Sequence, residues 1–114
     1  MRFRGLTVLL LVLITLALPT AASAKVHLVR VTSPARPGSY ATLTARVSAP
    51  RKCSITVYYK SGPSVAQGLY SKRPKAGKVS WTWMVGTNTT SGRWPIVVNC
   101  GAAGKLHTSF LVRR

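Results

Sequence analysis

The sequence predicts an all-β fold, an antiparallel sandwich of two sheets with about seven strands. Past residue 24, apolar and polar residues alternate in short runs, which is the period of half-buried strands. Glycine, proline and serine interrupt these runs, as they do at the turns of small β proteins. No run keeps helical apolar spacing for long, so helices are not expected in this part of the chain.

The first 24 residues have the layout of a secretory signal peptide. Arg2 and Arg4 precede the apolar run Leu6–Leu18, and the small residues Ala22-Ser23-Ala24 form a cleavage site. We expect a signal helix over 1–24, cleaved after Ala24, and one β-sandwich domain over 25–114. An uncleaved anchor helix is the alternative, because the segment nearly reaches bilayer length. Export places the domain outside the cell, secreted or on the cell surface, with no transmembrane segment after cleavage.

Six strands are expected from the alternation alone, at residues 26–31, 40–49, 53–61, 78–86, 93–100 and 106–112. The connection Ser61–Gly77 is longer than ordinary loops. It is either a crossover between the sheets, with a short seventh strand around Leu69 and Tyr70, or a functional loop.

All three tryptophans fall at inward-facing positions of the expected strands. Trp81 and Trp83 share a face with valines, and Trp94 shares one with Ile96. We therefore expect Trp81, Trp83 and Trp94 in the core rather than on a binding face.

Cys53 and Cys100 are the two cysteines of the chain, and both fall on inward faces. In an exported protein such a pair is expected to form a disulfide, whereas two free buried thiols are the alternative.

The chain has 17 lysines and arginines and no Asp or Glu, a formal net charge of +17. This composition excludes paired-carboxylate hydrolysis, an acidic member of a catalytic triad and carboxylate-bound metals. His27 and His107 lie in the first and last expected strands, but two histidines alone make a weak metal site. We expect a non-enzymatic protein with no cofactor and no metal.

The densest basic cluster comprises Lys72, Arg73, Lys75 and Lys78, with Lys60 at the other end of the long connection. Such a cluster suits phosphate or carboxylate groups spaced along a polymer, with counterion release driving the binding. The alternative is a solvated loop whose charges keep the protein soluble and its sheet edges unpaired. Expected partners are an anionic cell-envelope polymer, a polysaccharide or an acidic protein surface, with nucleic acid bound only non-specifically.

The segments "SPARPGSYATLTARVSAPRKCSITVYYKSGPS" and "GKVSWTWMVGTNTTSGRWPIVVNC" resemble immunoglobulin-like or fibronectin type III-like sandwich modules of bacterial secreted and envelope proteins. The resemblance covers nearly all of residues 25–114, and 79–100 is its most specific part. It implies an immunoglobulin-like two-sheet sandwich with a Cys53–Cys100 bridge. It implies no activity, since such modules serve as adhesion domains, spacers or carbohydrate-binding appendages.

These observations together predict an exported, strongly basic β-sandwich that attaches electrostatically to an anionic polymer or envelope surface. The alternative function is a structural or protein–protein interaction module for adhesion, with an acidic protein as its partner.

Overall fold

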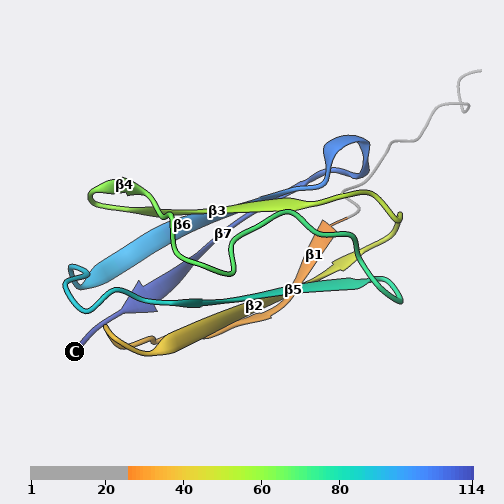
Figure 1. Ribbon diagram of the computed structural model, residues 1–114. Coiled ribbons are helices and arrows are strands. Elements are labelled where there is room, and N and C mark those ends of the chain that lie inside the picture. The colour runs from red at the N-terminus through yellow and green to blue at the C-terminus, as the bar shows by residue number, and fades with distance from the viewer. Residues whose placement is uncertain (1–25) are drawn as a thin grey trace, which may run out of the picture.

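The computed structural model describes residues 26–114, so the predicted signal peptide lies outside the described residues. Within this range the chain folds into short strands joined by turns, with a single 3₁₀ turn (Figure 1). In order these are β1 (Val26–Val31), β2 (Tyr40–Val47), β3 (Ser54–Tyr59), β4 (Gly62–Pro63), β5 (Lys78–Met84), β6 (Gly92–Asn99), η1 (Gly101–Ala103) and β7 (Lys105–Val112). In this range no helix is long and apolar enough to cross a membrane.

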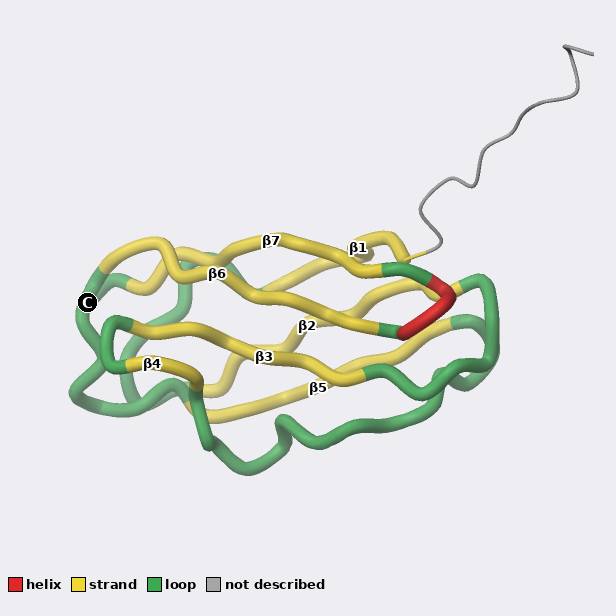
Figure 2. Tube along the Cα trace, turned by 90° about the horizontal axis from the view of Figure 1, so that it is seen from above, coloured by secondary structure: helices red, strands yellow, loops and turns green. Residues whose placement is uncertain are grey.

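The strands form two antiparallel sheets that pack face to face, with orders β1-β2-β5 and β4-β3-β6-β7. Figures 1 and 2 show the two layers, with β2 and β5 on one side and β3, β6 and β7 on the other. The predicted all-β, two-sheet antiparallel sandwich is therefore confirmed.

The long connection differs from the expectation in one respect. Its seventh strand is β4, directly after β3, and no strand forms around Leu69 and Tyr70. The indole Nε1 of Trp81 donates a hydrogen bond to the Tyr70 carbonyl oxygen at 2.8 Å. This carbonyl therefore accepts from a side chain instead of from the backbone of a neighbouring strand. The segment then crosses to β5, running alongside the sandwich in Figure 2. It is a crossover between the sheets.

The core lies between the sheets and contains Trp81 and Trp83, both fully buried. Trp83 packs edge-to-face against Phe110 of the opposite sheet, with ring centroids 5.7 Å apart. Its Nε1 donates to the Tyr59 hydroxyl at 3.1 Å. Trp94 is only partly buried at the rim of the core, because it lies at the start of β6 beside the 85–91 loop.

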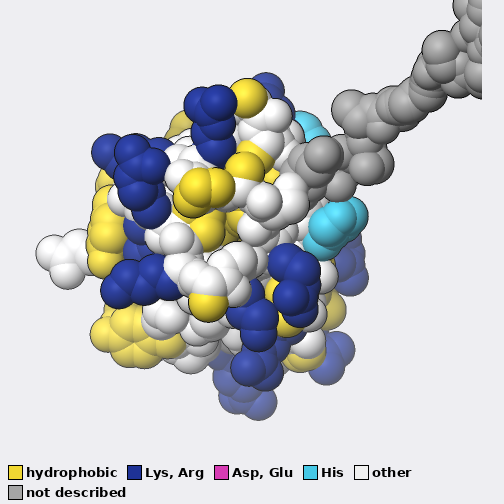
Figure 3. Space-filling model, turned by 90° about the vertical axis from the view of Figure 1, so that its right-hand side faces the viewer, with side chains coloured by type: hydrophobic (Ala, Val, Ile, Leu, Met, Phe, Trp, Pro, Cys, Tyr) yellow, Lys and Arg dark blue, Asp and Glu magenta, His cyan; other side chains and the backbone are white. Residues whose placement is uncertain are grey.

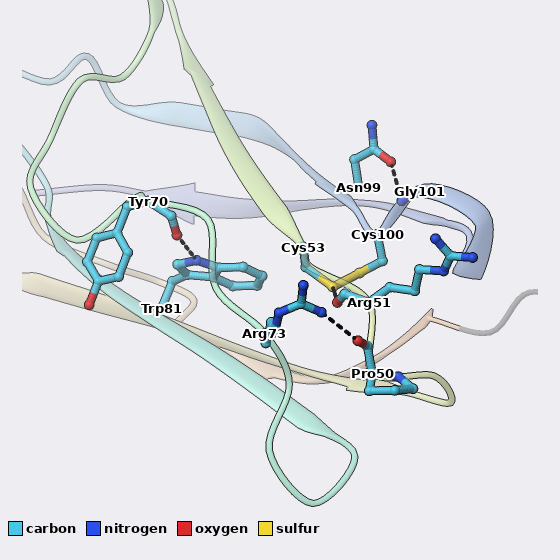
Figure 4. Close-up of a disulfide and its surroundings, with 9 residues drawn as sticks. All are labelled: Pro50, Arg51, Cys53, Tyr70, Arg73, Trp81, Asn99, Cys100 and Gly101. Atoms are coloured by element: carbon cyan, nitrogen blue, oxygen red, sulfur yellow. Dashed lines mark hydrogen bonds between the residues drawn. A yellow bond between two sulfur atoms is a disulfide. The ribbon is translucent and has the colours of Figure 1, made fainter.

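Cys53 and Cys100 form the predicted disulfide (Figure 4). Cys53 precedes β3 and Cys100 follows β6, so the bridge extends the register in which Ser54 pairs with Asn99. Its Cα atoms are 4.1 Å apart, as in a closely spaced cross-strand pair. The bridge thus joins neighbours within one sheet and holds the β3–β6 ladder at one end of the sandwich.

Candidate functional site

Most lysines and arginines of the described chain gather at one end of the sandwich, which we call the cationic end. It consists of the 48–53 loop, the 72–78 segment, the 101–104 turn and the strand ends beside them. Figure 3 looks onto this end and shows Lys and Arg side chains, in dark blue, around its rim. Its cations are Arg46, Arg51, Lys52, Lys72, Arg73, Lys75, Lys78 and Lys105.

The register of the three-stranded sheet places cations directly opposite one another. Arg46 of β2 pairs with Lys78 of β5. Lys78 in turn pairs with Lys75 across a tight turn. On the β1 side, His27 stands opposite Arg46. We call Arg46, Lys78 and Lys75 the cation row; all three are exposed.

A two-residue turn brings the lysines of the cation row together. Lys75 and Lys78 exchange both backbone hydrogen bonds, at 2.8 and 3.0 Å. Ala76 and Gly77 between them have φ of 52° and 78°. Positive φ at both central positions is the geometry of a type I′ hairpin turn. The turn therefore places two lysines opposite each other at the end of the sheet.

Lys72 and Arg73 hold the crossover against the rest of the fold. The Lys72 backbone exchanges hydrogen bonds of 2.9 and 3.0 Å with Cys53, and its Nζ donates to the Ser80 carbonyl oxygen at 2.8 Å. The Arg73 guanidinium donates to the Pro50 carbonyl oxygen at 3.1 Å (Figure 4). Both side chains keep further N–H donors free of these bonds, so they can also face an anion.

Lys60 does not join this cluster. It follows β3 at the opposite end from Cys53, roughly 20 Å away along the strand. There it borders a hollow of about 680 Å³ between residues 59–61 and 86–90. Lys60 is the one cation that lines this hollow. A smaller hollow of about 180 Å³ lies at the cationic end, between the 47–50 stretch and the turn around Gly77.

The electrostatics of the cationic end are unbalanced, because the chain has no Asp or Glu to pair with the row. Like charges directly opposite in a sheet destabilise it. Among the described residues no charged side chain is buried, so the cations stay in water, where they can exchange counterions for a ligand. Away from this end, in the core, burial raises the pKa of Tyr59, and the hydrogen bond from Trp83 partly offsets this rise.

Sequence reasoning grouped Lys72, Arg73, Lys75 and Lys78, which the structure brings together, but missed further cations of this end. These are Arg46, Arg51, Lys52 and Lys105. Arg46 was recognisable as an outward-facing position of its strand. What the sequence lacked was the register that sets it against Lys78, because strand pairing partners are not encoded locally.

His27 and His107 both lie exposed on separate strands, β1 and β7. In Figure 3 the two histidines, in cyan, are separate groups on this end. Within residues 26–114 no group of three or more metal-ligating side chains comes together.

Comparison with known proteins supports the fold. No protein-family model matches the chain, and a search of curated proteins finds no match. Among solved structures, the native conformation of E. coli alpha-2-macroglobulin is similar over 86% of this chain, at 19% identity and a TM-score of 0.58. The Y1175G mutant of Salmonella alpha-2-macroglobulin is similar over the same share, at 16% identity and a TM-score of 0.56. The chain spans 7% of the length of each.

A complex of titin M10 with an obscurin-like 1 Ig domain also matches, at 18% identity and a TM-score of 0.47, covering 76% of this chain and 89% of that one. At such identities the likeness concerns the fold alone. The chain is an antiparallel two-sheet β-sandwich.

Proposed function

We propose that this chain is an exported, non-enzymatic β-sandwich that attaches electrostatically to an anionic polymer or envelope surface through its cationic end. The observation that carries the proposal is the cation row, in which Arg46, Lys78 and Lys75 face one another in register. This arrangement lowers the stability of the sheet, and no carboxylate side chain of the chain relieves it. A polyanion laid across the row relieves the repulsion and releases its own counterions.

Export is supported by the disulfide, which persists in oxidising compartments. A non-catalytic role is supported by the composition, since a chain without Asp or Glu lacks the usual partners that orient or activate a catalytic histidine.

The test measures binding of the purified, oxidised protein to long-chain polyphosphate by titration calorimetry across a salt series. One variant removes the row, with Arg46, Lys75 and Lys78 each changed to Ser. For a flexible polyanion the slope of log affinity against log salt is about −0.7 per phosphate contacted. Losing three contacts should therefore reduce the slope by about 2.

A matched control removes three charges from the opposite end, with Arg36, Lys60 and Arg93 each changed to Ser. Its slope should change by less than about 0.5. Equal effects of the two variants would make the whole surface the binder and contradict a localised site. Absence of binding by the unmodified protein at low salt would refute attachment by charge and direct attention to a protein partner.

A further inference from the structure

The outer face of the β1-β2-β5 sheet continues from the cation row as an ordered series of polar pairs. β2 and β5 pair without interruption from Tyr40–Met84 to Arg46–Lys78. Successive outward-facing pairs lie about 6.8 Å apart along the strands. Beginning at the cationic end, the polar pairs are Arg46–Lys78, Thr44–Ser80 and Thr42–Thr82.

The two hydroxyl pairs offer both donors and acceptors to a ligand. Thr42 and Thr82 share a hydrogen bond of 2.8 Å between their hydroxyls, and Thr44 and Ser80 share another. In each pair one hydroxyl donates to the other, which leaves one O–H and several lone pairs directed to solvent. Sugar hydroxyls also donate and accept, so they match this surface. Fully ionised phosphate groups only accept hydrogen bonds, so they can use the donors of this surface but not its acceptors.

Cations flank the first hydroxyl pair on both sides. In β1, Arg30 stands opposite Thr44 and is exposed. On the β5 side, the Lys72 ammonium donates a hydrogen bond to the Ser80 carbonyl oxygen at 2.8 Å. At this level of the face, the protein thus offers cations to the acidic groups of a ligand and hydroxyls to its hydroxyl groups. A polymer that carries both kinds of group on each unit fits better than one that carries charge alone.

An exposed aromatic side chain ends the series. Tyr40 is 65% exposed and stands opposite Met84, which is 43% exposed. The distance from the cation row to this pair is about 20 Å, three steps along the strands. A flat aromatic ring at the end of a polar track suits the apolar face of a sugar ring.

We propose that the outer face of β1-β2-β5 binds an acidic polysaccharide along the strands, with its acidic groups on the cation row and on Arg30 and Lys72, and a sugar ring on Tyr40. This inference rests on the proposed function and names the class of polymer. Charge complementarity selects the occupant, and the hydroxyl pairs distinguish a glycan from a simple polyphosphate.

The test compares three polymers, polygalacturonate, uncharged dextran and long-chain polyphosphate, by titration calorimetry on the purified, oxidised protein. Polygalacturonate should bind the unmodified protein, and dextran should not. The variant Tyr40→Ala and the double variant Thr44→Val with Ser80→Ala should each weaken polygalacturonate binding at least about fivefold. Each should change polyphosphate binding less than about twofold.

The control is Tyr58→Ala, because Tyr58 is a tyrosine 39% exposed on the other sheet. It should leave both affinities unchanged, and melting curves should show all variants folded. If both face variants retain full polygalacturonate affinity, the glycan track is refuted while attachment by charge stands. If the unmodified protein binds neither polyanion, both proposals fail.

Discussion

The cation row predicts that this protein gains stability when one of its own lysines is replaced by an acid. Lys78 stands between Arg46 and Lys75 in cross-strand register, and each neighbour repels it. In Lys78→Glu both repulsions become attractions, while the backbone bonds between residues 75 and 78 are kept. The variant should melt at a higher temperature than the unmodified protein and bind polyanions more weakly.

The size of the effect follows from the register. Side chains opposite each other in an antiparallel pair place their charged groups about 6 Å apart, which in water corresponds to about 0.7 kcal/mol per pair. At 0.15 M salt the Debye length of about 8 Å reduces this by about half. Reversing the sign at two neighbours therefore adds about 1 kcal/mol to the free energy of unfolding, and about 2 kcal/mol at 0.01 M salt. For a domain of this size the melting temperature should rise by about 5 °C and about 10 °C, respectively.

The assay is thermal unfolding followed by circular dichroism, at both salt concentrations. Lys60→Glu is the matched control, because it changes the net charge equally at a turn far from the row. An equal gain in the control would assign the effect to overall charge. A gain in Lys78→Glu that does not shrink as salt rises would refute the electrostatic reasoning.

Further outcomes test the packing and the titrating groups. Changing Cys53 and Cys100 to Ala should lower the free energy of unfolding by about 4 kcal/mol, because the bridge closes a loop with a sequence separation of 47. Urea denaturation of both proteins measures the difference, and a loss under about 1 kcal/mol would contradict the loop-closure account. Gly68→Ala would place a Cβ 2.0 Å from the Thr82 carbonyl oxygen at φ +98°, so it should cost about 1–3 kcal/mol and speed hydrogen exchange across residues 64–77. Tyr59→Phe should cost about 1–2 kcal/mol at neutral pH, because a buried indole N–H loses its acceptor. Burial raises the pKa of Tyr59, so the folded state keeps a proton that the unfolded state loses above about pH 10. The free energy of unfolding of the unmodified protein therefore falls above this pH. Its difference from that of Tyr59→Phe should narrow when both are denatured at alkaline pH. Toward acid, the melting temperature should change by less than about 10 °C between about pH 7 and 3, because the chain has no Asp or Glu side chain to be protonated, and a larger fall would contradict this account.

Much of the fold was readable from local patterns. Alternation at Val79, Trp81 and Trp83 predicted a strand with one buried face, because the side-chain period of a strand is two residues. The long connection was less readable. A crossover was one of the two alternatives expected for it, but its course depends on Gly68 against β5 and on the indole of Trp81, which are distant contacts with no local signature.

The residue types alone set the chemistry available to this protein. It has cations without carboxylates, one pair of cysteines and inward-facing aromatics, and composition and side-chain period are local properties of the chain. Which cations lie side by side was set by the folding of the strands into two sheets. It set Arg46 against Lys78, separated Lys60 from the basic cluster and aligned the hydroxyl pairs with the cation row. The physical reason is register, since the partners across a sheet are chosen by the packing of the whole sandwich.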